Sequence, residues 1–321
     1  TATGNLRYLA TGDIRLASLN GANVLVNAGG SIIDNGETDV DVMATTAQLI
    51  AGTSIGEAAG TNNGPIETTV GTLAASAGTG NIYLSETDNL TIGSVAAIDV
   101  LRVNIDSTTT NQAGALLAGA IAAQNLKVEA GNGIIVANAV EATAADLLLD
   151  AQGGDLAINA TVDAGGNASL LASANITQAA AGDVTVGGTL DVNAQGGDIS
   201  MIDGAISTAT GNLRYLATGD IRLASVNGAN VLVNAGGSII DNGETDVDVM
   251  ATTAQLIAGT SIGEAAGTNN GPIETTVGTL AASAGTGNIY LSETDNLTIG
   301  SVAAIDVLRV NIDSTTTNQA G

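Results

Sequence analysis

The sequence contains no cysteine, histidine, phenylalanine or tryptophan, and its only prolines are Pro65 and Pro272. Catalysis near neutral pH relies most often on histidine or cysteine, and these two residues are also the commonest ligands of transition metals. Their absence argues against most nucleophile–base pairs, thiolate chemistry and haem. Sites built from Asp and Glu remain possible, but we predict that the chain is not an enzyme and needs no cofactor, with Ca²⁺ as a possible ligand.

Basic residues are also scarce, because seven Lys and Arg oppose 32 Asp and Glu and give a net charge of -25. A polyanion repels nucleic acid and anionic lipid, so we expect neither as a partner. The sequence has no apolar run of about 18 residues, the length that a membrane-spanning helix needs. We therefore predict no membrane insertion, while the acidic surface favours divalent cations.

Large apolar side chains are almost missing, since the four tyrosines are the only aromatic residues, yet 45% of the chain is hydrophobic. This content comes from Ala, Val, Leu and Ile, which suit a narrow interior filled by stacked aliphatic side chains. The 43 glycines follow no Gly-X-Y period, so they indicate many tight turns and not a collagen helix.

A long internal repeat dominates the sequence. Residues 1–114 recur as residues 208–321, and the only difference is Leu19 against Val226. We therefore divide the chain into one complete repeat unit, 1–207, and a partial second copy, 208–321, and we expect the second to continue the first without a break. Repeats of this kind are typical of solenoids, in which each unit contacts its neighbours.

Within the unit, short apolar runs of four to seven residues alternate with Gly, Asn, Asp and Thr. These runs have the character of strands, and the separators are too short to hold crossover helices. A tandem copy without an aromatic core favours stacked coils over a sandwich or a barrel. The predicted fold is an all-β, right-handed parallel β-helix with coils of about 20 residues, which at ~4.8 Å per coil forms a rod of roughly 75 Å. Asn27, Asn104 and Asn193 are candidates for asparagine ladders at its corners.

Several runs have the text apolar-x-apolar-x-Ala followed by Gly-Ser-Ile or a similar turn. They occupy residues 12–18, 23–34, 47–57, 64–75 and 80–93. This text resembles the coils of filamentous-haemagglutinin-type exoproteins. The resemblance implies a β-helix shaft of a giant bacterial protein that is secreted, often by two-partner secretion, and acts in adhesion or surface assembly. It therefore implies an extracellular or cell-surface location.

Three functions remain open. The near-identical 207-residue unit departs from the more degenerate repeats of that family, and this favours a structural fibre or sheath that associates with itself, end to end and laterally. The alternative is the stalk of an adhesin whose binding tip lies outside this sequence. A β-helix that binds or cleaves polysaccharide, with surface glycans as partners, is the third hypothesis.

The densest acidic stretch is a candidate calcium site, because Ca²⁺ prefers hard oxygen ligands. Its residues are Asp34, Glu37, Asp39 and Asp41, which recur as Asp241, Glu244, Asp246 and Asp248. However, Asp39 and Asp41 alternate with Val40 and Val42, and this pattern equally fits a strand whose acidic side chains face solvent. The alternation favours that second interpretation.

Two further sets of residues carry chemistry in other proteins. The carboxylates Glu86 and Asp88, or Asp99 and Asp106 beside Arg102, could form the pair that a glycan hydrolase uses, although an ion pair with Arg102 is the simpler prediction. Five asparagines begin Asn-X-Ser/Thr triplets and are candidate glycosylation sites, though such triplets also arise by chance. They are Asn89, Asn159, Asn167, Asn175 and Asn296.

Overall fold

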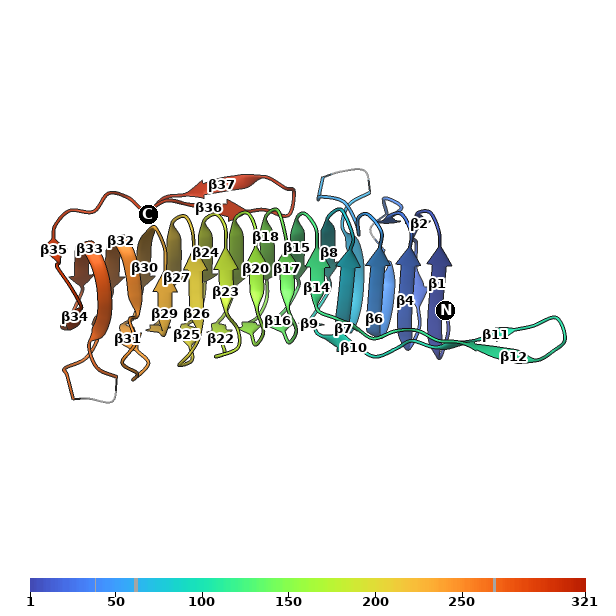
Figure 1. Cartoon of the computed structure of the whole chain (residues 1–321), viewed down its shortest axis with the longest axis horizontal. Helices are drawn as coiled ribbons and strands as arrows, with labels where there is room; N and C mark the ends of the chain where they lie inside the picture. Colours follow the sequence, from blue (N-terminus) through green and yellow to red (C-terminus); the bar gives the residue numbers. More distant parts are fainter. Residues whose placement is uncertain (38, 61–62, 268–269) are drawn as a thin grey trace.

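The computed structural model describes residues 1–37, 39–60, 63–267 and 270–321 and shows one elongated parallel β-solenoid (Figure 1). In these ranges the chain winds through about 13 coils of roughly 22 residues, and every regular element is a strand. The predicted all-β parallel fold is therefore confirmed. The main sheet of the described residues joins 29 strands, so the two copies of the repeat share one continuous hydrogen-bonded body.

The strands follow the chain in five groups. The first coils contain β1 (Asn5–Ala10), β2 (Ile14–Arg15), β3 (Leu19–Asn20), β4 (Asn23–Ala28), β5 (Ile32–Ile33), β6 (Val42–Ala51), β7 (Ile66–Ala77), β8 (Ile82–Glu86) and β9 (Leu90–Ile92). An excursion then holds β10 (Ser94–Val95), β11 (Val100–Val103), β12 (Thr109–Gln112) and β13 (Leu117–Ala118). The middle coils contain β14 (Ala120–Ala122), β15 (Leu126–Ala130), β16 (Ile134–Val136), β17 (Val140–Ala142), β18 (Leu147–Ala151), β19 (Leu156–Ile158), β20 (Val162–Ala164), β21 (Ala168–Ala172), β22 (Ile176–Gln178), β23 (Val184–Val186), β24 (Leu190–Ala194), β25 (Ile199–Met201) and β26 (Ile206–Ala209). The last coils contain β27 (Leu213–Ala217), β28 (Ile221–Leu223), β29 (Ser225–Asn227), β30 (Asn230–Ala235), β31 (Ile239–Asp241), β32 (Val249–Ala258), β33 (Ile273–Ala284), β34 (Leu291–Glu293) and β35 (Thr298–Ile299). The chain ends with β36 (Val307–Val310) and β37 (Thr316–Gln319).

A typical coil consists of three short strands, such as β21, β22 and β23, separated by tight bends. Each strand pairs in parallel with the strand one coil earlier and one coil later, so equivalent side chains form columns along the rod. One column runs through Ile14, Ile32, Ile55, Ile82, Leu126, Leu147, Ala168, Leu190 and Leu213. These side chains are buried in a single aliphatic cluster, which is the narrow core that the composition predicts.

Polar ladders hold two corners of the stack. In the first, Asn81, Asn125, Asp146 and Asn167 each accept a hydrogen bond from the backbone of the next coil, and Thr189 ends the row. In the second, the carboxylate or amide oxygens of Asp155, Asn175, Asp198 and Asp220 accept bonds in the same way, with Ser238 as the last donor. Ladders were predicted at corners, but the positions suggested for them were wrong. Asn104 lies in the excursion, and the rows do not pass through Asn27 or Asn193.

Two segments leave the stack, and we call them the first arm, residues 93–119, and the second arm, residues 300–321. Each arm carries an antiparallel hairpin, β11 with β12 and β36 with β37. In Figure 1 the first hairpin projects beyond β1, whereas the second lies along the middle coils above β24 and β18. Because the arms add no coils, about 13 coils at ~4.8 Å extend only ~60 Å, shorter than the predicted 75 Å.

The stack passes from the first copy to the second without interruption, because β26 spans Ile206–Ala209. However, the two copies differ in phase around the rod. Leu213 is the counterpart of Leu6, yet it stands in the column that begins with Ile14, one face further on, and this column continues to Val231. One unit therefore corresponds to eight coils plus one face, which is about a third of a turn.

Candidate metal centre

The candidate centre lies where the chain turns outward after β5 and returns to start β6. Arg15, at the end of β2, stabilises this turn. Its Nη1 donates hydrogen bonds to the backbone oxygen of Asp34 (3.0 Å) and to Oδ1 of Asn63 (2.9 Å), which precedes β7. Arg222 makes the same two contacts in the second copy. The arginine thus joins two loops through their neutral oxygens and leaves the nearby carboxylates free for other ligands.

Three of the four predicted carboxylates come together. In each copy the group offers oxygen atoms that all lie within 4.8 Å of one another; its members are Asp34, Glu37 and Asp41, and Asp241, Glu244 and Asp248. Asp34 is 2% exposed and Asp41 is 0% exposed, so Asp41 does not face solvent as the alternation suggested. It precedes the first residue of β6, where the pleat of the strand has not begun.

Asp39 and its counterpart Asp246 are exposed and stand outside the groups. In their place the fold brings in Glu67, which sequence inspection missed. The backbone N–H of Asp41 donates to the carbonyl of Glu67 (3.0 Å), and the N–H of Glu67 donates to Oδ2 of Asp41 (3.3 Å). Glu67 follows Asp41 by 26 residues, so only the length of this coil, which is set by the loop before β7, could have revealed the pair.

The carboxylates are only half satisfied. Oδ2 of Asp34 accepts the N–H of Gly36 (3.0 Å), and Oδ2 of Asp41 accepts that of Glu67. By contrast, Asp34 Oδ1, Asp41 Oδ1 and Glu67 Oε2 are buried without a hydrogen-bond partner among the described residues. The second copy likewise has three buried carboxylate oxygens without a hydrogen-bond partner in the described chain: Asp248 Oδ1, Glu274 Oε2 and Glu244 Oε1. A buried carboxylate oxygen without a partner is costly, so it either carries a proton or binds a cation.

The electrostatics of the centre favour protonation when no cation is bound. Burial, followed by the negative charge of Asp34, raises the pKa of Asp41 to about 8. Burial, together with the negative charge of Asp241, likewise raises the pKa of Asp248 to about 9. Burial also raises the pKa of Glu244 to about 7 and shifts the pKa of Glu67 upward. Such groups exchange protons for a bound cation in the range near neutral pH.

The donor set fits a hard divalent cation. It consists of carboxylate oxygens from two successive coils, and Ca²⁺ prefers six to eight such oxygens with backbone carbonyls and water as the remainder. The described residues contain two ion pairs, both at Asp191, and neither neutralises these clusters. Each copy of the unit therefore presents buried carboxylate oxygens without hydrogen-bond partners among the described residues, a donor set that suits one cation.

The other candidate carboxylates have structural partners. Glu86 is buried and accepts hydrogen bonds from the hydroxyl of Thr68 (2.7 Å) and the backbone of Val70 (3.0 Å). Asp99 and Asp106 accept bonds within the first arm, from Gly114 (2.7 Å) and Thr108 (2.6 Å) respectively. The predicted ion pair of Arg102 with these acids does not form within the described residues, and each acid instead fixes a turn.

The predicted glycosylation asparagines lie at different places. Asn89, Asn159 and Asn296 are exposed, but Oδ1 of Asn89 accepts a bond from Gly133. The amide nitrogens of Asn167 and Asn175 donate to Asp146 (3.1 Å) and Asp155 (3.0 Å) in the corner ladders. A glycan on either of these two nitrogens would break a ladder contact.

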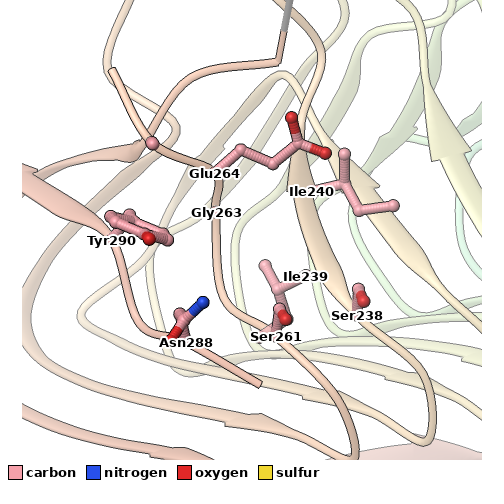
Figure 2. A pocket seen from close by; sticks show the side chains of 9 residues that line it. Ser238, Ile239, Ile240, Ser261, Gly263, Glu264, Asn288 and Tyr290 are labelled. Carbon is pink, nitrogen blue, oxygen red and sulfur yellow. The ribbon is translucent and has the colours of Figure 1, made fainter. Parts of the chain in front are cut away.

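A groove occurs at the same place in both copies. In the second copy it has a volume of about 340 Å³ and is lined by Tyr290, Asn288, Ser261, Ser238 and Glu264 among others. Figure 2 shows Tyr290 and Ile240 on opposite sides of it, with Glu264 as the one lining carboxylate. In the first copy Tyr83 is only 4% exposed, because Lys127 of the next coil lies over its ring and its hydroxyl bonds the hydroxyl of Ser314 (2.6 Å) in the second arm.

No protein-family model, curated protein or solved structure matches this chain. The resemblance to filamentous-haemagglutinin-type coils therefore stays a prediction, and the β-solenoid itself is what the structure establishes. Among the described residues, no helix has the length and apolar character needed to cross a bilayer.

Proposed function

We propose that this chain is part of the structural, non-catalytic shaft of an extracellular bacterial filament that is built from tandem copies of the 207-residue unit. The single observation that supports this function most strongly is the uninterrupted coil stack across the unit boundary. Leu190 in the first copy pairs with Leu213 in the second, and Leu213 pairs with Val231 without any change in the sheet. The second copy thus extends the first through the same parallel strand pairing that joins successive coils within one copy.

The composition supports the same function. A narrow aliphatic core, to which a strand such as β15 contributes Leu126, Val128 and Ala130, needs no aromatic residues and can be extended by further coils. The net charge of -25 keeps such a rod soluble and opposes uncontrolled lateral association in the absence of cations. Self-association along the axis, and laterally where cations neutralise the surface, follows from these properties.

The test is a chain extended by one complete copy of residues 1–207 placed before Thr1. Eight coils and one face correspond to ~40 Å of added length. Small-angle scattering should therefore show a rod that is about 40 Å longer at an unchanged cross-section. A second compact body joined by a flexible link, or an unfolded extension, would overturn the shaft function.

We further propose that each acidic cluster of the shaft binds one Ca²⁺ through Asp34, Asp41 and Glu67 or their counterparts. The buried carboxylate oxygens without partners support this proposal. Titration of the chain with CaCl₂ in a calorimeter should show two equivalent sites. The paired substitution Asp41→Asn and Asp248→Asn should abolish both, while the matched control Asp39→Asn and Asp246→Asn, at exposed positions outside the clusters, should leave both intact. Binding that persists in the first variant would contradict the assignment.

A further inference from the structure

The second arm is seated on coils of the first copy. The backbone N–H of Leu308 donates to the hydroxyl of Thr189 (3.0 Å), and that of Val310 donates to the hydroxyl of Ser169 (2.8 Å). Nζ of Lys127 donates to the carbonyl of Asn311 (2.7 Å). The hairpin thus crosses the strands β24, β21 and β15 and lies along the axis of the rod.

Apolar and charged contacts complete this seat. Val310 is 1% exposed and packs with Leu148 and Leu171 in a separate hydrophobic cluster. Arg309 forms an ion pair with Asp191 (2.8 Å), and the other oxygen of Asp191 binds Arg214 of the second copy (2.9 Å). We call this surface the bed; it consists of Lys127, Leu148, Ser169, Leu171, Thr189 and Asp191.

The first arm has the same sequence and the same base, but no bed. Asn5 Nδ2 donates to the carbonyl of Asp99 (2.8 Å), as Asn212 does to that of Asp306 (2.8 Å). At the tip the two arms differ, because Leu101 is 67% exposed, Val103 75% and Ile105 fully exposed. In the second arm Val310, the counterpart of Val103, is buried.

The unfilled seat of the first arm also has an electrostatic signature. Arg7 corresponds to Arg214, whose Nε donates to Asp191 (3.0 Å). Nε of Arg7 is buried and has no hydrogen-bond partner among the described residues. Beside it lies a groove of about 330 Å³ lined by Arg7, Leu9, Val100, Arg102 and Gln112. A carboxylate in the position of Asp191 would fit between Arg7 and Arg102 as it does between Arg214 and Arg309.

We propose that each arm is a strap that fastens one repeat unit to the unit before it, and that the tip of the first arm docks on a bed presented by a preceding copy of residues 126–194. This inference rests on the proposed tandem shaft and names the contact that joins its units. The occupant is a second copy of the bed because the identical second arm is seated on that surface in this chain.

The opposite end of the rod shows the complementary half of the contact. Tyr83, beyond the bed, is covered by Lys127 of the next coil and by Ser314 at the tip of the second arm, whereas its counterpart Tyr290 has neither neighbour among the described residues and is 37% exposed. The bed of the second copy would follow Tyr290 one coil later, so the uncovered tyrosine marks where the next strap would end. The two ends of the structure are thus complementary in the order that tandem copies require.

The chain lacks cysteine, so single cysteines report the burial of each tip by their rate of reaction with a thiol reagent. In the 321-residue chain, Val103→Cys should react at least about tenfold faster than Val310→Cys. When one copy is added before Thr1, the arm at residues 93–119 becomes the middle of three arms. Val103→Cys in this middle arm should then react as slowly as Val310→Cys. Asp191→Asn in the bed of the added copy alone should restore the fast reaction of the cysteine in the middle arm. The last arm, whose own bed is unchanged, serves as the control and should stay protected.

The outcomes separate this inference from the shaft function. If the extended rod lengthens and the cysteine becomes protected, the strap is supported. If the rod lengthens and the cysteine still reacts at the original fast rate, the strap is overturned while the shaft stands. If the rod does not lengthen, the shaft function and the strap are both overturned.

Discussion

Arg309 in the second copy of the repeat forms a 2.8 Å ion pair with Asp191 in the first copy, across the boundary between the units. Asp191 is fully buried and also binds Arg214, so a single carboxylate serves two arginines of the following copy. Removing it would leave Arg214, itself 5% exposed, as a buried charge without its partner. We therefore expect substitutions of Asp191 to destabilise the contact between the two copies of the repeat, which we call the joint, more than substitutions elsewhere in it.

Asp191→Ala should therefore destabilise the joint by about 3–5 kcal/mol, the usual cost of breaking a buried ion pair from one side. Denaturation in urea, followed by circular dichroism, measures the loss. Asp203→Ala removes an exposed carboxylate in the same coil, between β25 and β26, and should change stability by less than about 0.5 kcal/mol. If the two substitutions change the free energy of unfolding equally, the ion pair does not stabilise the joint.

Val310→Asp should release the second arm from its seat, because it places a charge between Leu148 and Leu171. Limited trypsin digestion reports the release as faster cleavage after Arg309. The same change in the first arm, Val103→Asp, alters a residue that is 75% exposed and should leave cleavage after Arg102 unchanged. A released second arm should then be cut as fast as the first, and slow cutting of the variant would contradict the seat.

Without divalent cations, the stability of the rod should fall as the pH rises from about 4 to about 9. Asp41 has a pKa of about 8 in the folded chain and Asp248 one of about 9, against an ordinary value of 3.8. Between these limits the folded chain binds more protons than the unfolded chain, so its extra stability is complete below pH 4 and disappears as the carboxylates ionise. Thermal unfolding in EDTA measures this slope, and the Asp41→Asn and Asp248→Asn pair should flatten it.

Addition of Ca²⁺ should reverse that dependence. A cation displaces the protons from Asp41 and Asp248, so calcium affinity should rise from pH 6 to pH 9 and the ion should stabilise the rod most at high pH. Calorimetry in two buffers of different ionisation enthalpy should reveal proton release on binding. Affinity that is independent of pH would exclude these two carboxylates as the ligands.

Asn167→Ala should weaken the first corner ladder. The amide oxygen of Asn167 accepts the N–H of Thr189 (3.0 Å), and its nitrogen donates to Asp146 (3.1 Å). Loss of both bonds should cost about 1–3 kcal/mol. The expected result is a lower urea midpoint, whereas Asn159→Ala, at an exposed position outside the ladder, should leave the midpoint in place.

The solenoid could be predicted from the sequence because its evidence is local. Short aliphatic runs such as Asn81–Ser85, bounded by Gly and Asn, define strands and bends, and the scarcity of aromatic residues excludes a wide core. The arms were missed for the same reason. Val100–Ile105 has the character of a strand whether it pairs within a coil or in a hairpin, and the tight turn of that hairpin has Ser107 at a φ of 63° instead of a glycine. The local sequence therefore does not distinguish a strand of the coil from a strand of a hairpin.

The candidate centre was predictable only as far as its residues are neighbours in the chain. Asp34, Glu37 and Asp41 share one turn, so their spacing suggested a cluster. Glu67 joins them through the register of β6 with β7, and this register depends on the number of residues between the two strands. The burial of Asp41 was also hidden, because the alternation rule applies inside a strand and Asp41 stands just before one.

The phase difference between the two copies has a consequence for the surface of a long filament. Because each unit ends one face further around the axis, equivalent loops and arms follow a spiral staircase. Three units restore the starting orientation after 25 coils, or ~120 Å. A neighbouring filament that lies alongside would therefore face equivalent loops and arms only once in every three units. This distance sets the spacing of any cross-links between parallel rods.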